Sequence, residues 1–145
     1  HYLTLMNSGG SGRLMRIYKI TACGAPTGTV TGFQMPLHVF RTTTNPTGGT
    51  SLTLYNAATG EAVIVARTAI GMTIPTNALT MELSPFGVGS VSVDEAFGGG
   101  LVNLYDFAIT GMRPIECMAG TGVTIRSGIS TGSGAVSVDC FFTLA

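Results

Sequence analysis

The chain has 145 residues, and its seven basic residues balance seven acidic ones to a formal net charge of +0 at pH 7. This balance excludes the basic surface that nucleic acid or an anionic membrane requires, so neither is an expected partner. Only 10% of the residues are charged while 45% are hydrophobic, which predicts that part of the surface lies against other protein.

Short segments of alternating apolar and polar residues, separated by turn residues, make up the first half of the chain. Pro36 lies in the clearest of them and has no N–H to donate, so we expect that strand to lie at a sheet edge or to bend there. Residues 56–62 alone suggest a helical turn. The alternation predicts strands at residues 2–6, 13–21, 33–40 and 52–54.

The second half continues in the same way. Residues 123–127 and 136–144 both alternate with a period of two, and glycines in the segment 130–134 between them predict a closing hairpin. No apolar run approaches the length of about 18 residues that a membrane span needs. Further strands are predicted at residues 63–69, 71–74, 79–83, 91–93, 101–109 and 115–118.

About nine or ten short strands with turn signals between them and almost no helix are typical of all-β proteins. The sequence therefore predicts one domain over residues 1–145, an antiparallel β-sandwich of the jelly-roll kind. A closed barrel is the structural alternative.

The three cysteines Cys23, Cys117 and Cys140 are odd in number and lack a Cys-x-x-Cys spacing. Neither a disulfide framework nor a zinc site is predicted from them. We expect buried free thiols, and Cys140 falls on the apolar side of its segment.

Candidate catalytic residues are few. Residues 128–132 match the Gly-x-Ser-x-Gly pattern of serine hydrolases, but no helix follows, and Ser130 falls in a predicted turn with only His38 as a possible base. Asp94, Glu95 and Asp106 are too sparse for a calcium loop, and sequence spacing cannot make them a glycosidase pair. We expect no enzyme activity, cofactor or metal.

Three residues are candidates for a subunit interface. Phe40 and Phe141 fall on the polar side of otherwise well-patterned strands, where an exposed aromatic ring marks a covered surface. His38 shares the side of its segment with Phe40. The alternative for both rings is a sheet face packed under another segment of the same chain.

Three segments resemble short virion proteins of tailed bacteriophages, the head-decoration and related accessory β-sandwich proteins. Residues 5–17 are similar to their opening strand, Asn-Ser/Pro-Gly-Ser-Gly turn and second strand, and residues 46–53 to their P-x-G-G-T-x-L-T segment. Residues 114–123 take the place of their strand, P-G-E-G turn and final hairpin, although 119–122 lack the proline and the acid.

This resemblance implies a non-enzymatic capsid decoration, or cement, protein. It implies a homo-oligomer, in this group often a trimer, that binds the major capsid protein on the outer surface of the virion. One alternative is a carbohydrate- or receptor-binding sandwich of a tail fibre or adhesin, in which Tyr55 or Tyr105 would stack on a sugar. Another is the subunit of an extracellular filament.

Overall fold

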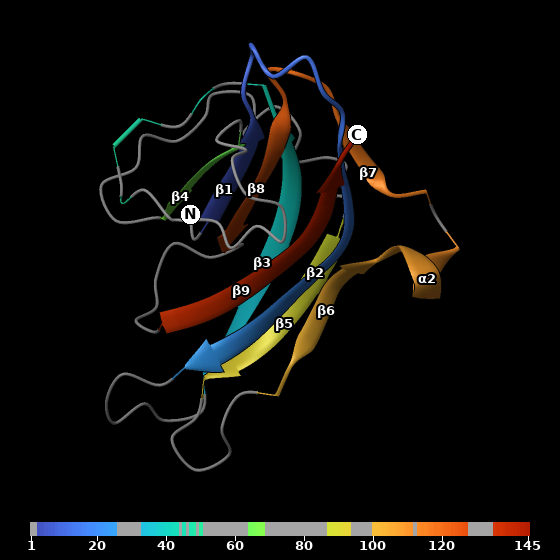
Figure 1. Ribbon diagram of the computed structural model, residues 1–145. Helices are drawn as coiled ribbons and strands as arrows, with labels where there is room; N and C mark the ends of the chain where they lie inside the picture. The colour runs from blue at the N-terminus through green and yellow to red at the C-terminus, as the bar shows by residue number, and fades with distance from the viewer. Residues whose placement is uncertain are drawn as a thin grey trace.

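In the computed structural model (Figure 1), most of the described residues lie in two antiparallel sheets, with one short helix among the described elements beside them. The structure describes residues 3–25, 33–43, 45, 47–48, 50, 64–68, 87–93, 100–111, 113–127 and 135–145. For these residues the predicted antiparallel, mostly β structure with almost no helix is confirmed.

The first sheet has β1 near its middle, hydrogen-bonded to antiparallel neighbours on both sides. Leu5 of β1 lies opposite Ala66 of one neighbour and Val123 of the other. The strand order is β4 (Ile64–Thr68), β1 (Leu3–Asn7), β8 (Gly122–Ser127), β3 (Phe33–Thr42) and β5 (Gly87–Val93).

The second sheet is organised around β2 (Met15–Ala25). The long strand β9 (Ala135–Leu144) follows one edge of β2 over its whole length. The shorter strands β6 (Val102–Asp106) and β7 (Ile115–Cys117) pair with different parts of β2, so they share its other edge. Tyr18 is one extra residue of β2 at a bulge, where the pairing with β9 shifts register.

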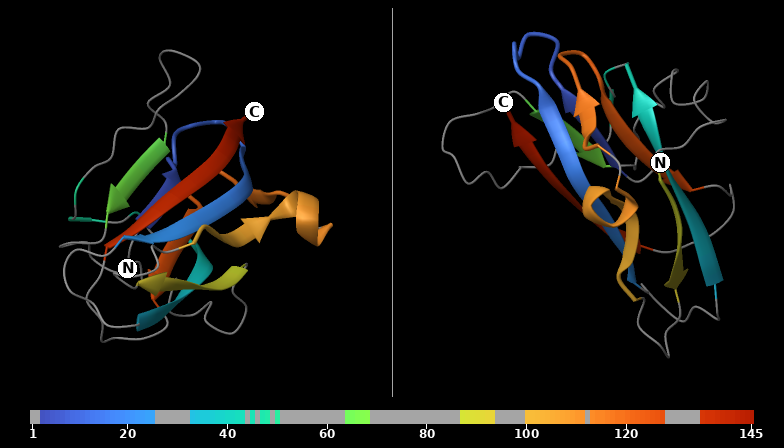
Figure 2. Two further views of the ribbon diagram at one scale, coloured as in Figure 1. Left: turned by 90° about the horizontal axis from the view of Figure 1, so that it is seen from below. Right: turned by 90° about the vertical axis from the view of Figure 1, so that its right-hand side faces the viewer.

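Apolar side chains of both sheets belong to a single hydrophobic core, which lies between the layers seen edge-on in Figure 2. The alternation of each strand selects which residues enter it. From the first sheet come Leu3, Leu5, Leu37, Val39, Val123 and Ile125, and from the second Met15, Ile17, Ile20, Ala22, Leu104, Tyr105, Ile115 and Cys117.

The opposite face of the first sheet is buried as well. Thr4, Met6 and Thr124 are 0% exposed, and the Thr4 and Thr124 hydroxyl groups share a hydrogen bond of 2.8 Å. A buried hydroxyl needs such a partner because it can no longer form hydrogen bonds with water. The central strands of the first sheet are therefore covered on both faces.

The predicted closing hairpin is wrong. β8 pairs with β1 and β3 in the first sheet, whereas β9 pairs with β2 in the second. Two strands with one apolar face each can lie on opposite sides of a shared core as readily as side by side, because both arrangements bury the same side chains.

The predicted strand at residues 101–109 is too long. β6 ends at Asp106, and α2 (Phe107–Thr110) follows as a single helical turn. The Asp106 carboxylate accepts a hydrogen bond of 3.0 Å from the Ala108 N–H and caps the turn, and Gly111 ends it with a φ of 63°. The alternation of apolar and polar residues predicted the strand but not the helical turn that Asp106 caps.

Pro36 lies in the part of β3 that pairs only with β5 among the described strands. The ladder with β8 begins one residue later, at Leu37. The missing N–H of proline thus falls where β3 has one neighbour, which agrees with the predicted edge position for this half of the strand. The other half of β3 is central.

Several predictions fall outside the described residues, namely the strands at 52–54, 71–74 and 79–83 and the helical turn at 56–62. The segment predicted at 63–69 is β4, and the one predicted at 91–93 is the longer β5. No helix of the described part is long and apolar enough to cross a membrane.

Candidate interaction surface

The outward face of the second sheet carries the most exposed aromatic ring of the described residues. Phe141 of β9 is 56% exposed, although its chain neighbours Cys140 and Phe142 are half-buried against the core. Lys19 of β2 is its cross-strand partner. A phenylalanine with this exposure leaves apolar area in water that a partner protein would cover.

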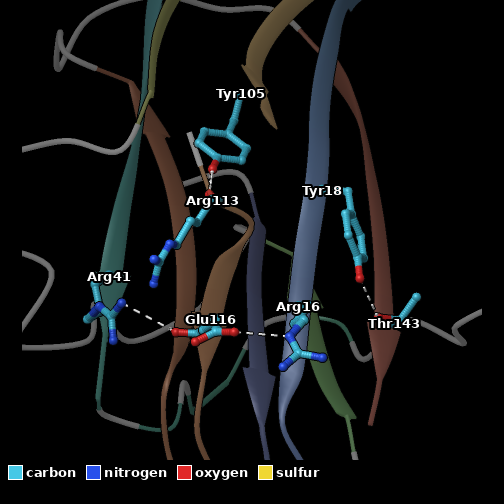
Figure 3. Close-up of polar contacts among 7 residues, drawn as sticks. All are labelled: Arg16, Tyr18, Arg41, Tyr105, Arg113, Glu116 and Thr143. Atoms are coloured by element: carbon cyan, nitrogen blue, oxygen red, sulfur yellow. Dashed lines mark hydrogen bonds and ion pairs between the residues drawn. The ribbon is translucent and has the colours of Figure 1, made fainter. Parts of the chain in front are cut away.

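The side chains around Phe141 on this face contact one another. The Tyr18 hydroxyl lies 3.2 Å from that of Thr143 on β9 (Figure 3), and the Tyr18 ring meets Phe107 of α2 edge-on at 5.2 Å. Lys19 Nζ lies 3.2 Å from an oxygen of Asp106. These contacts hold β6 and α2 against β2, so the face around Phe141 is built from four elements, β2, β9, β6 and α2.

A second polar group joins the two sheets at the β7 edge (Figure 3). The Glu116 carboxylate of β7 accepts a hydrogen bond of 3.0 Å from Arg16 of β2, and its backbone carbonyl accepts one of 3.3 Å from Arg41 of β3. Both side chains of the ion pair are partly exposed, at 38% and 54%. An ion pair in contact with water contributes about 0–1 kcal/mol, so its main effect is to orient Arg16.

The three predicted interface residues do not form one surface. Phe40 and His38 lie on β3 of the first sheet, and Phe141 lies on β9 of the second. Phe40 is only 1% exposed, with the Arg126 guanidinium 4.7 Å above its ring and the His38 ring edge-on at 5.7 Å. Its prediction as an interface residue is corrected to burial within the chain, and His38 is half-buried beside it.

Tyr105, predicted as a possible sugar-stacking residue, is 4% exposed and belongs to the core. Its hydroxyl donates a hydrogen bond to the carbonyl of Arg113 (Figure 3), and burial raises the pKa of the phenol. A ring enclosed in this way offers no face to a sugar. Tyr55 lies outside the described residues.

None of the three cysteines forms a disulfide, as expected, but the expected full burial holds only for Cys117, since Cys23 and Cys140 are half-buried. Burial raises the pKa of Cys117 to about 11, against a smaller opposing effect of Arg41 and of a hydrogen bond with Thr121. Burial also raises the pKa of Cys140 to about 12, and the Asp139 carboxylate adds to the rise. Neither thiol is a nucleophile at neutral pH, because the thiolate is the reactive form.

The remaining candidates for chemistry lie apart. Those outside the described part of the chain are Ser130, Asp94 and Glu95. Asp106 forms an ion pair with Lys19 and caps α2. Among the residues that the structure describes, no three His, Cys, Asp or Glu side chains gather as metal ligands would.

The sequence pattern missed three further exposed apolar side chains. Leu101 is 67%, Ile109 72% and Met118 71% exposed. They stand just before β6, in α2 and just after β7. Their apolar character fits the alternating pattern, so only the burial of each position in the fold distinguishes them from core residues.

Comparison of the chain with protein-family models, with curated proteins and with solved structures finds no match.

Proposed function

We propose that this chain is a non-enzymatic structural protein of a tailed-phage virion, a capsid decoration or cement protein. It binds the outer surface of the head as a homo-oligomer, a trimer by resemblance, and stabilises contacts between subunits of the major capsid protein. The proposal combines the sequence resemblance with a surface suited to contact with protein.

The single observation that carries the interaction role is the exposure of Phe141. In a chain with 10% charged residues, an aromatic ring 56% exposed on an otherwise polar strand face supports coverage by a protein partner. Leu101, Ile109 and Met118 add exposed apolar area outside this face. Several weak contacts made by each copy can together hold neighbouring capsid subunits firmly.

The fold that we propose for this role is a β-sandwich of the jelly-roll kind. Four features support it: two antiparallel sheets, a core shared between them, and chain crossings from one sheet to the other after β1 and after β7. A sandwich with a continuous core keeps its outer surfaces fixed relative to one another, as a protein that holds several capsid subunits in place requires.

Two of the segments that resemble decoration proteins lie in the described part. Residues 5–17 form β1, a turn and the start of β2, and residues 114–123 run from β7 through a turn into β8. Backbone hydrogen bonds of 3.0 Å from Asn7 N to Thr121 O and of 2.9 Å from Gly120 N to Asn7 O join the two turns. The resemblance therefore falls on segments that meet in space.

The test is the number of copies on the particle. Quantitative mass spectrometry of purified heads should give a copy number tied to the number of capsomers. Heads stripped of the chain should lose resistance to heat or chelator and regain it when the purified chain is added back. A few copies per particle, or heads equally resistant without the chain, would contradict the proposal, and a few copies would indicate a tail or fibre part.

A further inference from the structure

The core is closed along β2 but open along β9. The inward side chains of β2 are 0–1% exposed, whereas those of its partner strand β9 are all half-buried. Both rows face the same core, and β9 is simply farther from its centre. The members of the β9 row are Val136, Val138, Cys140, Phe142 and Leu144.

β9 is also an edge strand with little of the usual protection, since Asp139 is its single charged residue. Among the described strands it pairs only with β2, and Figure 2 shows it at the margin of the second sheet. Edge strands normally carry lysine, proline or a bulge that blocks further pairing. Residues 135–144 contain no Lys, Arg, Pro or Gly, and the bulge of this pair lies on β2.

We propose that the edge of β9 that faces away from β2 binds the same edge of β9 in a second copy of this chain, antiparallel about a two-fold axis. The second sheets of the two copies then form one continuous sheet. The inference does not rest on the capsid role. A second copy fits because it presents the same ten-residue strand with the same apolar row, so each half-open row covers the other.

Charge selects the register of this pairing. A two-fold axis at Asp139 would place two carboxylates opposite each other, which is unfavourable. An axis at Phe141 places the two exposed rings opposite each other and each Asp139 opposite Thr143 of the other copy. The two carboxylates are then about 14 Å apart, at about 3.4 Å per residue, and the rings gain an aromatic pair.

The inward rows agree with this register. Val138 then lies opposite Leu144, and Cys140 opposite Phe142, of the other copy. Each of these pairs is apolar and half-buried in the single chain. The contact is separate from any three-fold contact, so trimers could also be joined through it.

The first experiment compares the solution mass of the full chain with that of two variants. Phe141→Lys places two ammonium groups at the axis and should halve the mass of the assembly. Ile109→Lys makes the same kind of change at a residue that is 72% exposed on α2 and should leave the mass unchanged. Circular dichroism should show the same β content in both variants.

The second experiment tests the register with engineered cysteines. Directly opposite residues of an antiparallel pair have Cα atoms about 4.5–5.5 Å apart, within the reach of a disulfide. Phe141→Cys should therefore give a disulfide-linked pair under mild oxidation, assigned by peptide mass spectrometry. Thr143→Cys should not, because the two introduced thiols would be four residues out of register.

Three outcomes would overturn the inference. They are a single-chain mass for the wild type, a mass that Phe141→Lys leaves unchanged, and no covalent pair from Phe141→Cys. A trimer insensitive to Phe141→Lys would overturn the β9 pairing while the proposed capsid role stands. A mass halved by Phe141→Lys in a chain absent from phage heads would support the pairing and contradict the capsid role.

Discussion

Gly122 of β8 lies directly opposite Met6 of β1, at a point where the fold has no room for a side chain. A Cβ at position 122 would lie 2.7 Å from the Met6 sulfur and 2.8 Å from the Met6 Cα, and it would collide with the carbonyl oxygen of Leu5. Two of these three neighbours are backbone atoms, which cannot move aside without disturbing the β1–β8 ladder.

Gly122→Ala should therefore lower the free energy of unfolding by about 2 kcal/mol or more, the cost of forcing extra volume into a packed core. Urea denaturation measures the change. Gly10→Ala is the matched control, because nothing lies within 4 Å of a Cβ at that position. Equal losses in both variants would contradict the close approach of β1 and β8.

The Thr4–Thr124 hydroxyl pair should show energetic coupling. Thr4→Val alone removes the 2.8 Å partner of the buried Thr124 hydroxyl, which keeps only its longer hydrogen bond of 3.3 Å to the Leu3 carbonyl, and should cost about 1–2 kcal/mol. Adding Thr124→Val should cost much less than it does in the wild type, since both hydroxyls are then gone. A double-mutant cycle from urea denaturation should give a coupling of about 1 kcal/mol, and strict additivity would argue against the hydrogen bond.

Asn7 joins three segments through one buried side chain. Its Nδ2 donates to the carbonyl of Arg13 at 2.8 Å and to that of Cys117 at 2.9 Å, and the residue is 0% exposed. Asn7→Ala should lower the free energy of unfolding by about 2–3 kcal/mol, because it removes both donors. Ser11→Ala is the control, since the Ser11 hydroxyl makes only long, exposed contacts of 3.3–3.4 Å. A loss in Asn7→Ala no larger than in the control would contradict the bridging role.

The buried thiols should make the chain less stable at high pH. The folded chain keeps the Cys117 proton up to a pKa of about 11 and the Cys140 proton up to about 12, whereas the unfolded chain releases both near pH 8.5. Their contribution is complete below about pH 8.5 and is lost as pH rises through those folded values.

Urea midpoints at pH 7 and pH 10.5 measure this effect. The decrease between the two pH values should be smaller in Cys117→Ala than in the wild type, and comparing the decreases removes the pH-independent cost of the cavity. A thiol-specific reagent should modify Cys117 at pH 7 only after unfolding. Rapid labelling of Cys117 in the folded chain would contradict its burial.

The local alternation of apolar and polar residues predicted a strand correctly wherever one face of that strand packs against the core. Residues 136–144 alternate strictly, and the structure makes them β9 with one row against the core and Phe141 outside. The same pattern could not reveal that the row is only half-buried, because burial depends on how far β9 lies from the core centre.

The sequence by itself determined that this chain is built from short antiparallel strands, because alternation and turn residues act over a few neighbouring positions. Only the tertiary structure decided which strands pair, as the separation of β8 and β9 into different sheets shows. It also decided that Phe40 is buried while Phe141 is exposed, although both stand on the polar side of their strands. The reason is that pairing and coverage depend on segments far away in the chain, and no local pattern records them.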